Sequence, residues 1–381
     1  MTNNYGQGKT YLRGRGKPTP LRLVAADQQP QWDRFVNDHP RGHFLQSWGW
    51  GDLKAGSGWH PLRLALWDEP RGQMIAATQV LCRGASPQVF RHGARGIGRP
   101  QGYAPTLRVP LWLGNLAYIP KGPVIDWSQP DICGAFFTQL NAFLRRRGTI
   151  ALRLEPSLEV AVAADDRLQK SMAALPCYPV AAVQPTRTII LDLAPDPETL
   201  LAQMKEKWRY NVRLAGRKGV TIRAAQSADD VRAWYELLRT TGQRDQFGIH
   251  TLDYYLRCWQ IFAPRQQISL FLAEHAGQLL GGIFVALCAR QAIYLYGASS
   301  SEQRQLMPNY LLQWHAICWA REQGAASYDF WGIPATDDEN EPMAGVYRFK
   351  SGWGGRVTRF VGNYEHIYRP LAMRFAQPYL P

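Results

Sequence analysis

Short apolar stretches alternate with amphipathic stretches along the chain, and their spacing predicts strands and helices in turn. Apolar runs bounded by turn residues predict strands at 62–67, 73–82, 116–126, 150–154, 188–193 and 220–224, the third broken by Pro120. Helical periodicity predicts helices at 31–37, 46–54, 131–147, 197–216, 228–240 and 251–262. This order is typical of an α/β (α+β) protein.

The second half of the chain repeats a pattern of the first half. The segments 62–67 and 75–83, joined by a turn at Gly72, align with 269–274 and 280–290, joined by a turn at Gly277. Each copy continues with a strand, an amphipathic helix that ends at a glycine, and a short apolar strand. Strands joined by short glycine turns are antiparallel neighbours, whereas a strand, helix and strand in succession form a crossover. We therefore predict two domains, each with a mixed sheet flanked by helices.

The chain is basic, and the excess charge is unevenly distributed. It has 381 residues, with 44 Lys and Arg against 30 Asp and Glu, and a formal net charge of +14. Residues 1–20 are interpreted as a basic flexible tail, and residues 81–110 as a loop with five arginines and no acid. Such a surplus favours a polyanionic partner, either nucleic acid or the anionic face of a membrane.

Several classes of protein are disfavoured by the sequence. Apolar runs end short of the roughly 20 residues that a membrane-spanning helix needs, and residues 1–20 lack the apolar core of a secretory signal. We therefore expect a cytoplasmic protein, with peripheral contact at the inner face of the membrane left open. The six cysteines are scattered singly, with no Cys-x-x-Cys or His-x-x-x-His pair, so the sequence implies no metal and no cofactor.

The predicted sheets resemble those of the GNAT acyltransferases. In that fold, a glycine-rich turn at a helix N-terminus holds the pyrophosphate of acyl-CoA. The corresponding loop here, residues 299–309, contains no glycine, and the segment Pro120-Lys-Gly-Pro is equally unsuited. We therefore discount acetyl-CoA as the donor.

A closer resemblance is to the Fem family of peptidoglycan peptidyltransferases (FemA, FemB and FemX). It rests on five segments in family order: 44–54, 117–126, 207–220, 328–333 and 347–355. The resemblance implies two GNAT-like domains and transfer of an amino acid from aminoacyl-tRNA to an amine of a UDP-linked or lipid-linked muropeptide, with no role for DNA.

The same resemblance implies a domain division. The first GNAT-like domain is expected at 21–178 and the second at 179–356, with 357–381 returning to complete the first. Several relatives carry a long coiled-coil arm, but no heptad run exists here, so we predict no such arm. Residues 81–110 are a candidate replacement that binds anionic lipid or tRNA.

Amide formation from an aminoacyl ester needs a positive charge near the tetrahedral oxyanion, and Lys350 is the candidate. The pair Phe349-Lys350 resembles the catalytic Phe-Lys pair of the family, and it precedes a glycine-rich turn. The alternative is that Lys350 is a solvated lysine at a strand end.

The other candidates concern substrate binding. Arg209 and Arg213 share a helix face and can grip a diphosphate, or they belong to a solvent-exposed basic face. Lys54 resembles the diphosphate-binding lysine of the family, and Arg213 its arginine, although Lys54 could simply cap a helix. The remaining candidates are Asp126 and Glu365, which resemble acidic muropeptide contacts, and Tyr296 and Asp329, which could line the second-domain crevice. The spacing from Lys350 to Glu365 departs slightly from the family pattern.

Two other functions remain open at this stage. One is a different GNAT-like N-acyltransferase acting on a small amine, which the fold alone does not separate. The other is a non-enzymatic RNA- or membrane-binding protein that uses only the basic surface.

Overall fold

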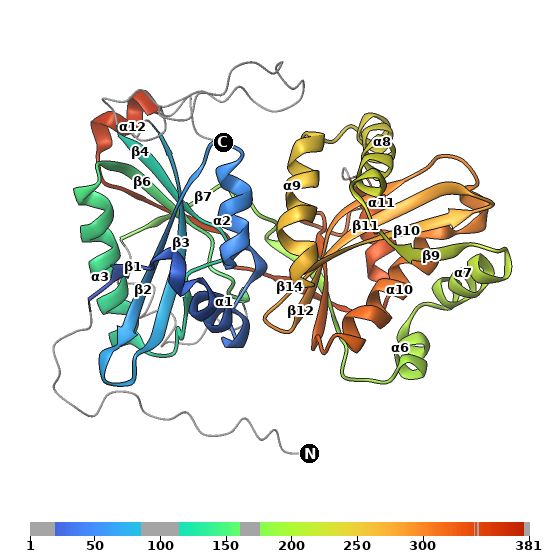
Figure 1. Cartoon of the computed structure of the whole chain (residues 1–381), viewed down its shortest axis with the longest axis horizontal. Helices are drawn as coiled ribbons and strands as arrows, with labels where there is room; N and C mark the ends of the chain where they lie inside the picture. The colour runs from blue at the N-terminus through green and yellow to red at the C-terminus, as the bar shows by residue number, and fades with distance from the viewer. Residues whose placement is uncertain (1–19, 85–113, 161–175, 339, 341–342, 377–381) are drawn as a thin grey trace.

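The computed structural model describes residues 20–84, 114–160, 176–338, 340 and 343–376, so most of the basic tail and of the 81–110 loop lies outside the described residues. Two sheets stand side by side, each flanked by helices (Figure 1). The first sheet has the order β1-β2-β3-β4-β6-β15-β7, with β5 beside β3, and the second has the order β14-β8-β13-β12-β11-β10-β9. The predicted architecture of two mixed sheets is confirmed.

The strands of the first sheet are β1 (Arg22–Leu23), β2 (His60–Asp68), β3 (Gln73–Gly84), β4 (Asn115–Ile119), β5 (Val124–Ile125), β6 (Thr149–Leu154), β7 (Tyr178–Val180) and β15 (Asn363–Ile367). Those of the second are β8 (Arg187–Asp192), β9 (Thr221–Ala224), β10 (Ile268–His275), β11 (Gln278–Cys288), β12 (Gln291–Ser299), β13 (Ser327–Gly332) and β14 (Arg356–Arg359). The α-helices are α1 (Gln29–Asp38), α2 (Trp48–Ala55), α3 (Pro130–Arg146), α6 (Pro197–Gln203), α7 (Glu206–Arg217), α8 (Ala228–Asp245), α9 (Leu252–Phe262), α10 (Pro308–Glu322), α11 (Ala344–Ser351) and α12 (Pro370–Ala376).

The internal repeat is visible in the strand pairing. The pairs β2–β3 and β10–β11 are antiparallel, and their turns contain Gly72 at φ +62° and Gly277 at φ +78°, where glycine is favoured. In each sheet the next strand, β4 or β12, is antiparallel to its predecessor and parallel to β6 or β13. Helices α3 and α10 make these two crossovers. The repeat in the sequence therefore corresponds to a repeat of strand pairing and connection in the two sheets.

Two connections cross between the sheets in opposite directions. The chain leaves the first sheet after β7 and enters the second at β8, then leaves the second after β14 and returns to the first at β15. The two connections touch, because the Phe360 amide donates to the Thr186 carbonyl at 2.7 Å. The predicted return at residue 357 falls inside β14, which still pairs with β8; the crossing itself lies between Arg359 and Asn363.

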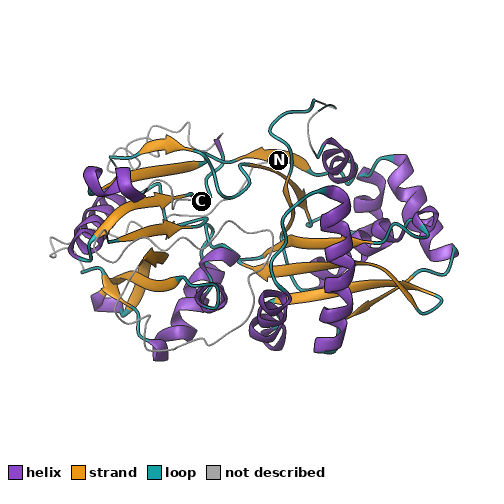
Figure 2. Cartoon of the chain, turned by 90° about the horizontal axis from the view of Figure 1, so that it is seen from above, coloured by secondary structure: helices purple, strands orange, loops and turns teal. Residues whose placement is uncertain are grey.

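A hydrophobic core cluster is shared by both domains. It joins buried residues of α1 and of the 3-10 helix Phe44–Gln46 before α2, such as Trp32 and Phe44, to residues of α8 and α9, such as Trp234 and Phe262. The rings of Phe44 and Phe262 are 4.6 Å apart at their centroids. Figure 2 shows the two helix-flanked sheets from above. Because this interface is apolar and continuous, side chains from both domains can be held in fixed positions across it.

Two elements differ from the sequence-based expectation. The predicted helix 197–216 is broken, because Met204 adopts an extended conformation between α6 and α7 and the Lys205 amide donates to the Gly352 carbonyl at 2.9 Å. Lys350 lies in the helix α11 rather than at a strand end. Between Val220 and Phe262 the chain forms β9, α8 and α9, without a coiled-coil arm. Among the described residues, no helix is long and apolar enough to cross a membrane.

Candidate active site

The Lys350 ammonium is buried inside the second domain. Only 7% of the residue is exposed, and its Nζ donates to the Gly332 carbonyl at 2.8 Å. The same Nζ lies 5.4 Å from the centre of the Tyr294 ring. Burial lowers the pKa of Lys350 to about 8, against the opposing effect of the negative charge of Asp329. The alternative of a solvated lysine is therefore wrong.

Asp329 is a buried carboxylate whose negative charge acts on the Lys350 ammonium. It lies on β13, and its Oδ1 accepts hydrogen bonds from the Thr188 hydroxyl and from the Trp331 amide, the latter at 2.7 Å. Burial raises the pKa of Asp329, while the Thr188 hydrogen bond and the charges of Lys121 and Lys350 oppose that rise. Asp329 therefore provides negative charge to two buried lysines.

The second of these lysines, Lys121, lies where the two connections cross. It is buried, and its Nζ donates to the Pro185 carbonyl at 3.1 Å and lies 4.0 Å from the centre of the Phe360 ring. Burial lowers the pKa of Lys121 to about 8, against the charges of Asp329 and Glu155. Lys121 thus links the first domain to both crossing segments.

Lys54 forms a second cationic centre, between the domains. It is half-buried at the end of α2, and its Nζ donates to the hydroxyl of Tyr254 on α9 at 3.2 Å. That hydroxyl is 3.1 Å from the hydroxyl of Tyr296, on β12. The Lys54 Nζ also lies 4.6 Å from the centre of the Trp50 ring. Lys54 does more than cap a helix, because it contacts the opposite domain.

The electrostatics around Lys54 reflect this partial burial. Burial lowers the pKa of Lys54 to about 8. His250 stacks on the Tyr254 ring with centroids 3.7 Å apart, and burial together with the Lys54 charge lowers the pKa of His250 to about 3. The imidazole is therefore neutral at physiological pH, and Lys54 is the cation of this cluster. An anionic group placed here would meet a positive charge in an aromatic setting.

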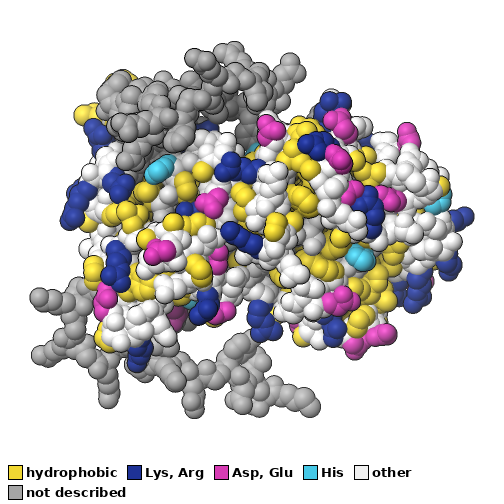
Figure 3. Space-filling model, viewed as in Figure 1, with side chains coloured by type: hydrophobic (Ala, Val, Ile, Leu, Met, Phe, Trp, Pro, Cys, Tyr) yellow, Lys and Arg dark blue, Asp and Glu magenta, His cyan; other side chains and the backbone are white. Residues whose placement is uncertain are grey.

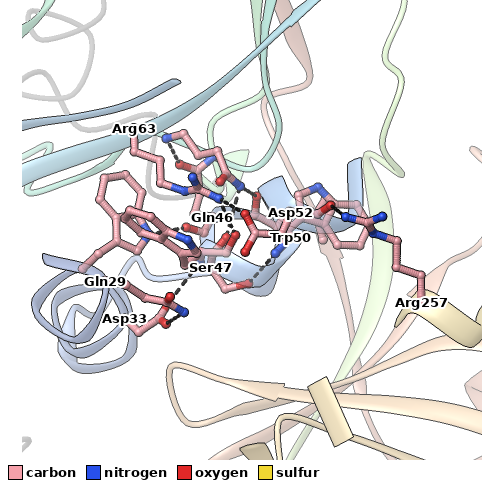
Figure 4. A network of polar contacts seen from close by, with 12 residues as sticks. Gln29, Asp33, Gln46, Ser47, Trp50, Asp52, Arg63 and Arg257 are labelled. Atoms are coloured by element: carbon pink, nitrogen blue, oxygen red, sulfur yellow. Dashed lines mark hydrogen bonds and ion pairs between the residues drawn. The ribbon is translucent and has the colours of Figure 1, made fainter. Parts of the chain in front are cut away.

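A polar network holds α2 in place, as Figure 4 shows. Asp33 on α1 accepts a hydrogen bond from the Trp48 amide at 3.0 Å, and the Arg63 guanidinium donates to the Trp48 carbonyl at 2.8 Å. Arg63 also pairs with Asp52 at 2.7 Å, and Arg257 on α9 donates to the Asp52 carbonyl at 3.1 Å. The helix that carries Lys54 is thereby fixed both to its own domain and to the other one.

The two arginines of α7 have different environments. Arg209 donates to the carbonyls of Ala202 and Met204, at 3.0 and 2.6 Å, where α6 ends. Arg213 is exposed. Arg209 is thus committed to carbonyls that the broken helix leaves without intrahelical partners. Arg209 is half-buried and Arg213 is accessible to a ligand, and the grip of both guanidinium groups on one diphosphate stays a prediction.

Phe349 is partly buried and packs against the core of the second domain. Its ring lies 5.4 Å from that of Tyr310 and 5.8 Å from that of Trp353. Its carbonyl accepts a hydrogen bond from the Trp208 indole of α7 at 2.9 Å. Phe349 therefore fixes α11, and with it Lys350, against α7 and α10.

The arrangement of these groups can be compared with known proteins. The sequence profile of the FemAB family matches residues 28–174, 178–276 and 273–379. The chain belongs to the FemAB family. Relatives of this FemAB protein include the lipid II:glycine glycyltransferase of Staphylococcus aureus strain COL, which is 23% identical over an alignment of 408 positions that covers 88% of this chain and 90% of the relative. The enzyme of the same name from strain USA300 is 22% identical over the same shares.

The fold comparison agrees with the family assignment. The crystal structure of FemX matches with a TM-score of 0.78 and 21% identity, and covers 93% of this chain and 99% of its own. A conserved protein of unknown function from Bacteroides thetaiotaomicron shares the fold with a TM-score of 0.56 and 9% identity, over 91% of this chain and 98% of its own. The predicted family resemblance and the fold of two mixed sheets flanked by helices are confirmed, and the FemAB chain is a transferase.

Two predicted acidic residues of the FemAB chain are engaged elsewhere. Asp126 accepts hydrogen bonds from Ser128 and from Gln129, at 2.6 Å in each case, just before α3 begins. Glu365 is buried on β15, where one oxygen pairs with Arg153 at 2.7 Å and the other accepts from the Tyr178 hydroxyl at 2.9 Å. Both carboxylates hold local structure, and their contact with substrate stays a prediction.

The structure therefore groups the FemAB candidates differently from the sequence. Lys54 and Tyr296 meet through Tyr254, and Lys350 and Asp329 form a separate buried pair. Sequence reasoning missed Lys121 and the aromatic partners of Lys54. The sequence did contain a signal for Lys121, because a single lysine stands between Pro120 and Gly122 at the end of an apolar strand. A lysine is rarely buried unless its charge is paired, so a lysine in such a place is a candidate functional residue.

Proposed function

We propose that this FemAB protein transfers an amino acid from aminoacyl-tRNA to an amine of the peptidoglycan stem peptide, and that its acceptor is the lipid-linked muropeptide. The observation that carries the proposal is the buried Lys350 ammonium on α11, in a chain whose curated relatives are named lipid II:glycine glycyltransferases. The relatives support both the acyl acceptor and the type of bond.

The chemistry needs little beyond a placed positive charge. The neutral amine of the stem peptide attacks the ester carbonyl carbon, and the carbonyl oxygen becomes an oxyanion. The ester bond to the tRNA ribose then breaks, and the proton lost by the amine ends on the released ribose hydroxyl. A lysine ammonium has three N–H donors, and Lys350 uses one for Gly332, so the group can also donate to the oxyanion.

Binding of the acceptor diphosphate fits the Lys54 centre. In the proposal, the Lys54 ammonium contacts the phosphates, and Tyr254 and Tyr296 supply hydroxyl donors beside it. Arg213 adds an exposed guanidinium that can bind a phosphate in a bidentate manner. The family resemblance of Lys54 and Arg213 to diphosphate-binding residues supports this assignment.

Binding of the tRNA donor fits the outer face of α7. Figure 3 shows Lys and Arg side chains gathered at the right-hand edge of the molecule, where α7 lies in Figure 1. Apart from Arg213, the exposed basic residues of α7 and its flanks are Lys205, Lys207, Arg217 and Lys218. Tyr210, on the same helix, is 55% exposed and can stack on a base. Such a surface binds the phosphate backbone in a salt-dependent manner.

A transfer assay tests the proposal. Radiolabelled aminoacyl-tRNA is offered with the lipid-linked or the UDP-linked muropeptide to the wild type, to Lys350→Met and to Arg239→Met, which removes an exposed cation on α8 and serves as the control. We expect tRNA-dependent incorporation into the lipid-linked acceptor that is lost in Lys350→Met and retained in Arg239→Met. Incorporation from a free amino acid or acyl-CoA, or none with either acceptor, would contradict the proposal.

A further inference from the structure

The last helix of the described chain exposes two large apolar side chains. Leu371 is 74% exposed and Phe375 is 62% exposed, whereas Ala372 and Met373 between them are buried in a small core with residues of β4 and β6. Leu371 and Phe375 are four residues apart, so they lie on the same face of α12. That face points outward, where a surface helix usually carries polar residues.

Basic residues surround this apolar pair. The backbone amide of Arg369 donates to the Ile150 carbonyl at 3.2 Å, and the Tyr368 hydroxyl donates to Asn141 on α3 at 2.8 Å, so α12 lies beside the end of α3. The exposed arginines contributed by these two segments are Arg145, Arg146, Arg147, Arg369 and Arg374. Residues 141–152 and 366–376 contain no acidic residue. We call Leu371, Phe375 and these five arginines the α12 patch.

We propose that the α12 patch docks the protein on an anionic phospholipid bilayer. Leu371 and Phe375 enter the boundary between headgroups and acyl chains, and the arginines contact lipid phosphates. The end of the first domain that carries α12 shows basic and hydrophobic side chains next to one another, at the upper left of Figure 3. The patch is an observation of its own, and only its purpose, access to a lipid-linked acceptor, rests on the proposed function.

Charge complementarity favours a bilayer over other occupants. In a two-fold dimer formed through this face, the five arginines of one copy would face those of the other across the interface. A nucleic acid would match the arginines but would not cover the protruding Leu371 and Phe375. An anionic lipid surface satisfies both features, because it offers negative headgroups with an apolar layer directly beneath.

The patch also lies at the same end of the first sheet as Lys54. The Asn115 side chain donates to the Arg147 carbonyl at 3.0 Å, and Asn115 begins β4 beside the end of β3. Arg83, near that end of β3, lowers the pKa of Lys54 through its charge, although burial is the larger cause. A bilayer on the α12 patch therefore lies on the side of the molecule where Lys54 would meet the diphosphate of a lipid-linked substrate.

Vesicle sedimentation tests the docking directly. The full chain is mixed at low salt with phosphatidylcholine vesicles, with or without phosphatidylglycerol, and compared with L371S/F375S, with R145E/R146E and with R232E/R239E, a charge-matched control on α8. We expect binding only to the anionic vesicles, at least about tenfold weaker for either patch variant, with about a fivefold loss for each arginine removed from the lipid surface. The control should bind almost as the wild type does.

Three results would overturn the docking. They are wild-type binding that does not depend on anionic lipid, unchanged binding by L371S/F375S, and a wild-type dimer in sedimentation velocity that L371S/F375S converts to monomer. Because both apolar residues are exposed, an unchanged melting temperature for that variant checks that it is folded. Transfer to an acceptor in detergent should be unchanged in L371S/F375S, while transfer to the same acceptor in vesicles falls. If the wild type binds anionic vesicles as expected but transfers no amino acid to the acceptor in detergent or in vesicles, the proposed function is contradicted and the docking still holds.

Discussion

At the scale of single residues, three lysines share an unusual environment. Burial lowers the pKa of Lys54, Lys121 and Lys350 to about 8 in each case. Buried ammonium groups cost stability and persist where charge is needed. If Lys350 stabilises the oxyanion, Lys350→Met should lower kcat by about a hundredfold or more, while Lys350→Arg retains part of the activity. Single-turnover transfer measures both, and equal activity of Lys350→Met and wild type would contradict the role.

The same residue gives a stability prediction with a definite sign. The pKa of Lys350 is about 8 when folded and near 10.5 when unfolded, so between these pH values the unfolded state binds more protons. The cost of burying the charge is therefore complete below pH 8 and disappears as the pH rises toward 10.5. We expect Lys350→Met to be more stable than wild type by about 1–3 kcal/mol at pH 7, and this gain to shrink above pH 8. Urea unfolding at several pH values measures the difference.

Asp329 should set the pH range of the reaction. Its charge raises the pKa of Lys350, so Asp329→Asn should lower that pKa below about 8 and begin the alkaline decline of kcat at a lower pH. Thr188→Val is the matched control, because it removes the hydroxyl donor to Asp329 but leaves the negative charge. Identical pH profiles for wild type and Asp329→Asn would show that the two groups are not coupled during transfer.

How far the sequence predicts these residues depends on where their partners lie along the chain. Lys350 could be singled out because the residues that mark it, Phe349 and the following glycines, are its neighbours in sequence. The burial of Lys350 could not be predicted, because it depends on Gly332 and Tyr294. Lys121 was missed for the same reason, since its surroundings are created where distant segments cross.

At the scale of elements, the break between α6 and α7 separates the roles of two arginines. Arg209→Ala should cost about 1–2 kcal/mol of stability, because two carbonyls at the end of α6 lose their donor, with little change in the acceptor KM. Arg213→Ala should leave the melting temperature unchanged and raise the KM for the lipid-linked acceptor about tenfold. Thermal unfolding and steady-state transfer measure the two effects, and the reverse pattern would assign diphosphate binding to Arg209.

The elements that the sequence predicts well are those with a strong local period. The paired hairpins and the crossover helices α3 and α10 follow directly from their apolar spacing and glycine turns. The break at Met204 could not be predicted, because the hydrogen bond from Lys205 to Gly352 that accompanies it joins segments far apart in sequence. Local periodicity thus fixes the repeat, whereas tertiary contacts fix the helix ends that carry the candidate site.

At the scale of the whole molecule, the crossing of two connections ties the sheets together. The chain of β14 continues into β15, and β15 is clamped by Glu365, which holds Arg153 of β6 and Tyr178 of β7. A substitution at Glu365 should therefore weaken the packing of the segment that joins the two sheets. Because the domains also share a hydrophobic core cluster, we expect them to unfold as one cooperative unit.

Glu365→Gln tests this coupling. The change leaves Arg153, which is largely buried, without its carboxylate, and it should cost about 2–4 kcal/mol. Hydrogen exchange of the slowest amides should then accelerate by the same factor in β6 of the first sheet and β13 of the second. Glu274→Gln is the control, because it affects an ion pair of Glu274 with Arg223 at the edge of the second sheet. It should change the stability and the exchange rates by much less. Acceleration confined to β6 would mean that the two sheets unfold separately, and that the crossing connects them without coupling their stability.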